Sequence, residues 1–558
     1  MLKKENKGIT LVALVITIII LLILATISIQ SLTNTGLFAK AQEAKEKTQN
    51  AEKNQARILN EYEDELNKYV SGVSKVDTDW TGKVNKPKLM TGMTAIKFNE
   101  PTGDERANEG SVVKTTDTDT AWYDYDAKKW ANAQTEDGSM WVWIPRFAYK
   151  INNSNKTFDI VFLKDTTNNY VENGTEKNAE TEGYTIHPAF KNESSTGYEN
   201  GGWDKELTGI WFSKFEAGFA SGNNSATVKE SSVKYTQASA WVAGVELGSS
   251  DTTATARNFL DGEYGVKSGS DYTFKNGTAP SIKYPTFQGL TYSMNYINHN
   301  DAFNISKTLT ESGNIYGLSN SSTDSHMMKN SEWGAVAYLS QSKYGLNETN
   351  IYINNVNLNN TSKSVYAVTG CAGATEDASV VATTIIELNN RTTSGVYVWT
   401  QKSGTKASTT GTIYGIYDMS GGAWERSAGL VNNGNANLST YGQSMLNALN
   451  NGKSSKYVTV YPYDSSVDKD GANIDTASAA NWKANTKIYG DGIRETSTAG
   501  TGKTSWYGDY SYFPAVNSPF SKRGGGYWVT DGAGLFSFYR AGGNSDYSSG
   551  FRSVLVAQ

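Results

Sequence analysis

A charge-free apolar run near the start of the chain, Ile9 to Ile29, constrains the fold of this sequence more than any other feature. At about 1.5 Å of rise per residue, a helix of this length would span the roughly 30 Å hydrocarbon core of a bilayer. Lysines at positions 3, 4 and 7 precede the run, so the positive-inside rule predicts a cytoplasmic N-terminus. We therefore expect a transmembrane helix at 9–29 and a single-pass protein of the cell membrane, with the bulk of the chain outside the cell.

Residues 7–12, where the apolar run begins, read Lys-Gly-Ile-Thr-Leu-Val. They resemble the leader junction of type IV pilins and pseudopilins. The resemblance implies that residues 1–8 are a leader, that a prepilin peptidase cuts after Gly8, and that Ile9 becomes the N-methylated terminus. The family usually has Glu at the fifth mature position, where this chain has Ala13, and this difference favours cleavage and membrane insertion over assembly into a pilus. A plain signal anchor is the alternative.

Residues 30–75 predict a helical stalk. After a break at Asn34-Thr35-Gly36, the sequence is rich in Ala, Glu, Lys and Gln, which are strong helix formers. Apolar residues recur at intervals of three and four from Ile58 to Val70 and mark one stripe. We expect this stripe to pack on the next domain rather than on a partner chain.

The composition changes abruptly near residue 76, where Gly, Thr, Asn, Asp and aromatic residues begin to alternate in short runs. The chain has 33 Tyr, 14 Trp and 53 Gly, which is typical of β-rich domains with many loops. We predict a small β-rich region or linker at 76–137, and a main domain at 138–558 whose core begins with an apolar strand at 140–147. The Asn-rich stretch 432–455 is expected to form a long surface loop.

The charge and the metal-binding residue types exclude several classes of function. A net charge of -5 without a basic stripe disfavours nucleic-acid binding. Cys371 is the one cysteine, and the three histidines lack the spacing of a zinc site, so we expect no disulfide and no cofactor. Asp468, Asp470 and Asp475 form part of a calcium-loop pattern without its terminal Glu, which leaves a structural calcium ion open.

Five widely spaced segments point to a fold family. They are Gly-Ile-Trp-Phe-Ser-Lys-Phe-Glu at 209–216, His-Met-Met-Lys-Asn-Ser-Glu-Trp at 326–333, Tyr-Gly-Ile-Tyr-Asp-Met-Ser-Gly-Gly-Ala-Trp-Glu at 414–425, Arg-Gly-Gly-Gly at 523–526 and Gly-Phe-Arg at 550–552. In this order they resemble the formylglycine-generating-enzyme-like (sulfatase-modifying-factor) branch of the C-type lectin fold. The fold class predicted for the whole chain is therefore α+β, with a transmembrane helix and a helical stalk ahead of a C-type-lectin-like domain.

These five segments also predict local roles. By the resemblance, residues 326–333 open a helix. Trp333 and Trp424 are large enough to fill core volume, and Arg552 can fork onto backbone or carboxylate acceptors.

The same resemblance argues against catalysis. Enzymes of the family need cysteines between the Arg-Gly-Gly and Gly-Phe-Arg segments, and residues 527–549 contain none. A thiolate mechanism cannot run without a thiol, and Cys371 does not lie at the matching place. The related iron-dependent sulfoxide synthases would need a histidine cluster that this chain lacks. We therefore expect a protein that is not an enzyme.

The C-terminal segment 523–552 is the predicted ligand-binding face. Rigid aromatic residues alternate there with small polar residues on a glycine framework, as in binding loops. The alternative is that its aromatic residues are ordinary core of a lectin fold. The predicted ligand-binding residues are Tyr527, Trp528, Val529, Thr530, Asp531, Tyr539, Arg540, Asn544, Asp546, Tyr547, Ser548 and Ser549.

This segment is also similar to the variable proteins of diversity-generating retroelements, whose C-type lectin domains end in a hypervariable ligand-binding segment. Asn, Ser, Tyr, Asp and Gly are the residues that mutagenised adenine-rich codons encode. The leading hypothesis is a surface-displayed adhesion protein that binds an extracellular protein or glycan and contacts the membrane through its N-terminal helix. The alternative is a minor type IV pilin or pseudopilin whose C-terminal domain caps a filament.

Overall fold

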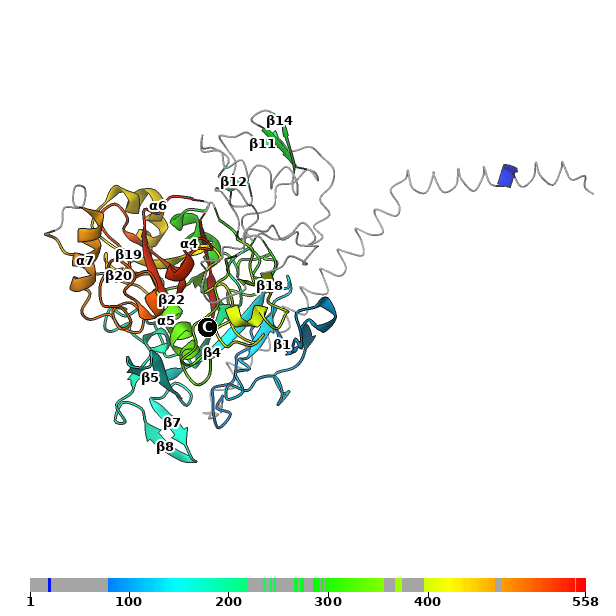
Figure 1. Ribbon diagram of the computed structural model, residues 1–558, viewed down its shortest axis with the longest axis horizontal. Coiled ribbons are helices and arrows are strands. Elements are labelled where there is room, and N and C mark those ends of the chain that lie inside the picture. The colour runs from blue at the N-terminus through cyan, green and yellow to red at the C-terminus, as the bar shows by residue number, and fades with distance from the viewer. Residues whose placement is uncertain are drawn as a thin grey trace, which may run out of the picture. The chain divides into compact units, whose positions relative to one another are not determined.

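The structure is a computed structural model, and it describes residues 79–218, 285–355, 367–373, 396–466 and 473–558, without residues 292, 296 and 547. It also describes short pieces at 19–21, 234–235, 241–242, 245–246, 265–268 and 271–274. The chain divides into two units, Met1–Val76 and Asp77–Gln558, and Figure 1 shows the helices and strands of the second. All the sheets described below belong to the larger unit.

A seven-stranded antiparallel sheet has the strand order β16-β24-β10-β4-β3-β1-β2. The neighbouring strands β10 and β4, in the middle of this sheet, are buried along their whole length. Their residues are almost all apolar or small, as expected for a sheet that is covered on both faces. The predicted strand at 140–147 is confirmed in part, because β4 ends at Pro145 and Phe147 begins the next strand. The strands are β1 (Thr94–Asn99), β2 (Ser111–Lys114), β3 (Asn132–Gln134), β4 (Met140–Pro145), β10 (Gly209–Ser213), β16 (Thr323–Met327) and β24 (Ser553–Ala557).

Strands β1, β2 and β3 come from residues 76–137, for which we expected a small β-rich region or linker, and they extend the same sheet as β4. Strand β24 lies between β10 and β16, and its register pairs Trp211 with Leu555 and Ser325 with Leu555. This position brings the residues just before β24 next to the end of β10. As a result, the first and last of the five family-like segments are neighbours in space.

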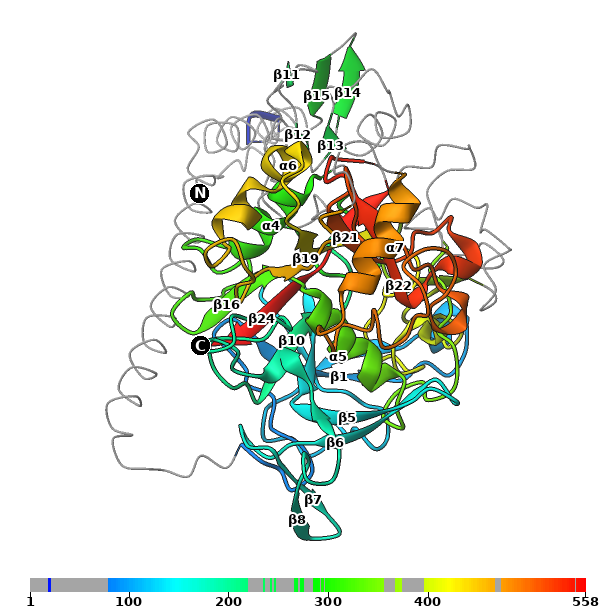
Figure 2. The same cartoon turned by 90° about the vertical axis from the view of Figure 1, so that its left-hand side faces the viewer.

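A five-stranded sheet includes the three strands β21, β22 and β23, which lie wholly or partly in the C-terminal segment 523–552. Its path is β20-β19-β21-β22, and β23 pairs with β19 in parallel. Figure 2 shows β19, β21 and β22 side by side, with α7 next to them. The elements are β19 (Trp424–Val431), β20 (Thr459–Tyr461), β21 (Phe520–Gly524), β22 (Gly534–Ala541), β23 (Ser549–Phe551) and α7 (Ile474–Ala484).

The remaining helices are short. Helix α5 begins where the family-like segment 326–333 predicted a helix, because the Glu332 carboxylate accepts a hydrogen bond from the Lys329 backbone N–H at 2.8 Å. Helix α6 occupies part of the stretch that we expected to be a loop, so that prediction is wrong. The helices are α4 (His299–Lys307), α5 (Asn330–Ser340) and α6 (Ala436–Asn447), with 3₁₀ turns at Arg106–Asn108, Pro188–Phe190, Gly404–Ala407, Trp506–Gly508 and Thr530–Gly532.

The described residues also form several smaller sheets. A three-stranded sheet joins β5 (Phe147–Asn152), β6 (Thr157–Phe162) and β9 (Thr185–Ile186), and two hairpins are formed by β7 (Asn169–Glu172) with β8 (Thr175–Asn178) and by β17 (Cys371–Gly373) with β18 (Val396–Val398). The others are β11 (Lys234–Tyr235), β15 (Asp271–Phe274) and β14 (Gly265–Ser268) in one sheet, and β12 (Trp241–Val242) with β13 (Val245–Glu246).

The predicted fold class, an α+β chain led by a transmembrane helix and a helical stalk, is wrong. The described chain is mostly β, with 29% in strands and 16% in helices. Among the residues that the structure describes, none forms a helix with the length and apolar character that a bilayer crossing needs. The body of the chain is β-rich because short runs of aromatic and β-branched residues pair as strands there, whereas the helices are 9 to 12 residues long. The predicted segments 9–29 and 30–75, and the processing residues Gly8 and Ile9, lie outside the described residues except for 19–21.

Candidate functional site: an aromatic patch over a buried polar network

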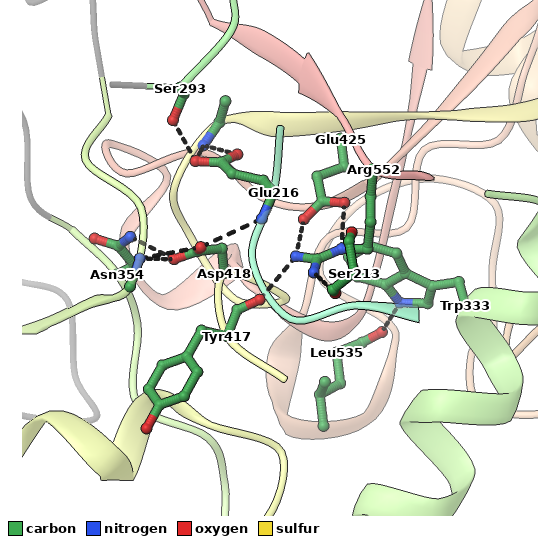
Figure 3. Close-up of polar contacts among 12 residues, drawn as sticks. Ser213, Glu216, Ser293, Trp333, Asn354, Tyr417, Asp418, Glu425, Leu535 and Arg552 are labelled. Carbon is green, nitrogen blue, oxygen red and sulfur yellow. Dashed lines mark hydrogen bonds and ion pairs between the residues drawn. The ribbon is translucent and has the colours of Figure 1, made fainter. Parts of the chain in front are cut away.

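The family-like segments meet at a buried ion pair (Figure 3). Arg552 donates from Nε and Nη2 to the two carboxylate oxygens of Glu425, at 2.9 and 2.7 Å. The same guanidinium donates to the carbonyl oxygens of Ser213 at 2.6 Å and Tyr417 at 2.7 Å. The prediction that Arg552 forks onto backbone and carboxylate acceptors is therefore confirmed. This one side chain joins segments 209–216, 414–425 and 550–552.

Two further carboxyl groups lie beside this pair. Glu216 accepts hydrogen bonds from the Ser293 hydroxyl and from the Ala423 backbone N–H. Asp418 accepts from the Asn354 side-chain amide and from the Gly370 backbone N–H, both at 2.8 Å (Figure 3). These bonds leave few acceptor positions of the two carboxyl groups unused.

Burial dominates the titration of all three acids. It raises the pKa of Asp418 to about 6 and that of Glu425 to about 7, although Arg552 lowers both. It also raises the pKa of Glu216 well above its usual range.

The other two segments pack against the same region. Trp333 is buried in α5 and donates its indole N–H to the Leu535 carbonyl oxygen at 2.7 Å. The Arg523 guanidinium lies 5.4 Å from the centre of the Trp333 ring and donates to the carbonyl oxygens of Ser537 and Asp491. Arg523 and Arg552 are completely buried, so both guanidinium groups join parts of the scaffold to one another.

The residue types that metal or thiol chemistry would use are dispersed. Cys371 is buried in β17. Within the described ranges, no group of three or more His, Cys, Asp or Glu side chains could hold a metal ion. Of the partial calcium pattern, Asp468 and Asp470 lie outside the described residues, while Asp475 pairs with Arg540 at 2.6 Å.

The predicted ligand-binding residues fall into groups with different exposure. Tyr527, Val529 and Ser549 are buried, and Tyr547 lies outside the described residues. The half-buried ones are Trp528, Thr530, Tyr539, Arg540, Asp546 and Ser548, and the exposed ones are Asp531 and Asn544.

Four half-buried rings form what we call the aromatic patch: Tyr510, Tyr512, Trp528 and Tyr539. The ring of Tyr539 lies 5.0 Å from that of Tyr512, which lies 5.7 Å from that of Tyr510. Trp528 packs on the same apolar cluster as Tyr539 and Tyr510, and this cluster includes the buried Trp424, whose ring is 5.1 Å from that of Tyr539. The patch therefore combines solvent-facing rings with a fixed base.

Sequence reasoning missed two of these rings. Tyr510 and Tyr512 lie outside the segment 523–552, but the backbone of Tyr512 donates to the Phe538 carbonyl oxygen, and that of Tyr510 donates to the Gly532 carbonyl oxygen. The sequence Gly508-Asp-Tyr-Ser-Tyr512 has the same mixture of Tyr and small polar residues as the predicted face. From this composition, Tyr510 and Tyr512 could have been identified as candidate binding residues.

Lys522 was also missed, because it precedes the predicted face. It is 8% exposed, and its ammonium lies 5.5 Å from the Trp424 ring centre and 5.8 Å from that of Tyr539. Burial lowers the pKa of Lys522 to about 8, with a further lowering by Arg426 that Asp546 opposes. A cation therefore lies at the base of the aromatic patch.

The described residues of the loop, 544–546 and 548–549, are held against the sheet by charge. Asp546 accepts hydrogen bonds from the Ser548 backbone N–H at 2.8 Å and from the Ser549 hydroxyl at 3.1 Å, and it pairs with Arg426 at 3.2 Å. Although burial raises the pKa of Asp546, Lys522 and Arg426 lower it to about 2. Asp546, Ser548 and Ser549 thus fix the loop.

No protein-family model matches this chain, and no curated protein is a significant match to it. The described residues define a mostly β protein in which an aromatic patch rests on a buried polar network.

Proposed function

We propose that this chain is a non-catalytic ligand-binding protein that acts outside the cell and holds a protein or glycan ligand at the aromatic patch. The observation that carries this proposal is the cluster of half-buried rings around Tyr539, with neighbouring ring centres 5.0 to 5.7 Å apart. Tyr and Trp dominate binding energy at protein surfaces because they contribute large contact areas with few rotatable bonds.

The base of the patch supports a preformed site. Tyr539 lies on β22, which pairs with β21 through Lys522, and Trp424 lies on β19 in the same sheet. The Arg552–Glu425 ion pair fixes the residue next to Trp424. A site that is rigid before the ligand arrives loses less conformational entropy on binding.

The proposal includes the scaffold, which resembles the formylglycine-generating-enzyme-like family. Its support is that residues of the family-like segments contact one another in one buried network (Figure 3). The role as a retroelement-diversified variable protein belongs to the same proposal, and its support is the concentration of Tyr, Asn, Ser and Asp in 527–549. Location outside the cell is supported by the prepilin-like sequence around Gly8 and Ile9, on which the alternative of a minor pilin also depends.

The experiment is a binding screen of the full-length chain against extracellular proteins and glycans, followed by three variants. Trp528→Ala and Tyr539→Ala remove rings of the patch, while Tyr184→Ala removes a half-buried ring that bonds Asp159 in another sheet. We expect a ligand found in the screen to lose at least about tenfold in affinity with each patch variant and to keep its affinity with Tyr184→Ala. Ligands that bind all three variants as tightly as the unchanged chain would refute the proposal.

A further inference from the structure

Lys522 shares one face of the five-stranded sheet with the base of the aromatic patch. It lies on β21 opposite Arg426 of β19 and opposite Tyr539 of β22. Directly opposed residues of paired strands project to the same side of a sheet. The Lys522 ammonium therefore lies beside the rings of both Trp424 and Tyr539, at 5.5 and 5.8 Å from their centres.

The ammonium has more hydrogen-bond donors than protein acceptors. A lysine ammonium carries three N–H donors. Among the described residues, the Ser549 hydroxyl, 3.1 Å away, is its acceptor. A nine-tenths buried ammonium with unused donors is costly, and an acceptor supplied by a ligand would remove part of that cost.

The charges around Lys522 do not balance. The groups that act on it are Arg426 and Asp546, and Asp546 is already bonded to Arg426 and to Ser548 and Ser549. His299, which accepts a hydrogen bond from Arg426, adds no positive charge, because burial lowers its pKa well below the usual range. Two cations thus face one carboxylate, and the site has one positive charge in excess.

We propose that Lys522 is the residue through which the aromatic patch recognises a carboxylate of an acidic protein segment. This inference rests on the proposed function and names its ligand class. A carboxylate would accept the free N–H donors and neutralise the excess charge. The rings of Trp424 and Tyr539 are inclined at 45°, and those of Tyr512 and Tyr539 at 53°. Tyr and Trp are enriched at protein interfaces, where they supply most of the binding energy, and this favours a protein ligand over a sugar acid.

The test uses the full-length chain and two blocked peptides, hexaglutamate and hexaglutamine, in calorimetric titrations. We expect hexaglutamate to bind more tightly than hexaglutamine, and Lys522→Met to weaken hexaglutamate binding about tenfold or more. The control is Lys307→Met, which removes an exposed lysine that lies 4.6 Å from the ring of Tyr457. That variant should bind hexaglutamate like the unchanged chain.

The pH dependence of the unchanged chain is an independent measurement that needs no variant. Because the pKa of Lys522 is about 8, its charge is mostly lost by about pH 9.5, and hexaglutamate affinity should fall about tenfold between about pH 7 and pH 9.5. In Lys522→Arg the cation persists over this range, so its affinity should stay constant. A parallel loss in the arginine variant would contradict the inference.

Other outcomes separate this inference from the proposed function. If Tyr539→Ala abolishes hexaglutamate binding while Lys522→Met leaves it unchanged, the inference is wrong and the proposed function stands. Equal binding of the two peptides also overturns the inference, whereas the proposed function is judged by the ligand screen alone. Lys522-dependent binding of oligogalacturonate in place of hexaglutamate would assign the site to a sugar acid and overturn the choice of a protein ligand.

Discussion

Arg552 and Glu425 form a two-point ion pair that is completely buried, and the same guanidinium bonds two backbone carbonyl oxygens. Every polar atom that the arginine carries is therefore used to join strands that are far apart in the sequence.

Removing the arginine should be strongly destabilising. In Arg552→Met, the Glu425 carboxylate and the carbonyl oxygens of Ser213 and Tyr417 lose their donors, so we expect the free energy of unfolding to fall by about 3 to 5 kcal/mol. Denaturant titration at about pH 8, where Glu425 is ionised, measures the change. The control, Lys83→Met, breaks an exposed pair with Asp126 and should leave the denaturation midpoint unchanged. Equal midpoints for both variants would contradict the structural role of Arg552.

The contribution of two buried carboxyl groups to stability should decrease as the pH rises from about 4 to about 7, whereas the buried His187 and His299, whose pKa values are lowered by burial, contribute in the opposite direction. Burial raises the pKa of Asp418 and of Glu495 to about 6. At a pH between this value and the pKa that the group has in the unfolded chain, the native state therefore binds more protons than the unfolded chain. The contribution of each group to the free energy of unfolding is fully present at a pH below its pKa in the unfolded chain. This contribution, on the order of 2 kcal/mol for each group, is lost as the pH rises through 6. Urea titrations of the unchanged chain and of Glu495→Gln between pH 4 and pH 8 isolate the contribution of Glu495. The free energy of unfolding of the unchanged chain relative to that of Glu495→Gln should fall as the pH rises through this range, and a constant difference would exclude Glu495 as a source.

A methyl group at Gly421 should not be tolerated. Its φ is +80°, and a Cβ there would collide with the Asn354 carbonyl oxygen and the Ile353 side chain. We expect Gly421→Ala to lower the free energy of unfolding by about 3 kcal/mol or more. Gly174→Ala is the matched control, because Gly174 has a φ of +76° but open space around it, so only backbone strain of about 1 kcal/mol remains. Similar losses in the two variants would show that the collision does not matter.

Asp546→Asn tests the charge balance around the patch. Without this carboxylate, Arg426 and Lys522 face each other uncompensated, so the pKa of Lys522 should fall below about 8. The free energy of unfolding should fall by about 2 kcal/mol, since the low pKa of Asp546 records a favourable native interaction. NMR titration of the lysine side chains reports the pKa. Asp204→Asn, which breaks a pair with Lys456, should leave Lys522 unaffected.

Local pattern predicted the parts of this fold that depend on a single element. Most of the apolar run at 140–147 forms β4, the segment 326–333 opens α5, and Trp333 and Trp424 are core residues, as expected. In each of these cases the physical cause lies within a few residues, in side-chain alternation, a capping carboxylate or an apolar volume that must be buried.

Features that depend on distant partners were not predicted. Helix α6 lies in an Asn-rich stretch of low helix propensity, and it is held by burying Leu438 and Met445 against the rest of the molecule. Lys522 became a candidate only because pairing of β21 with β22 places it under Tyr539. Tyr510 and Tyr512 joined the patch through hydrogen bonds to residues 532 and 538. Pairing partners of this kind are not encoded in local composition.

The position of β24 also governs the order in which this molecule can assemble. Ser213 and Arg552, which the ion-pair network brings into contact, are separated by 339 positions in the chain. The seven-stranded sheet cannot close until Ser553–Ala557 has left the ribosome, because β10 and β16 have no direct pairing without it. Contacts this remote in sequence make folding slow. The pairing of β16 with the rest of the sheet therefore comes last, whereas β10, β4, β3, β1 and β2 can pair before β24 has been made.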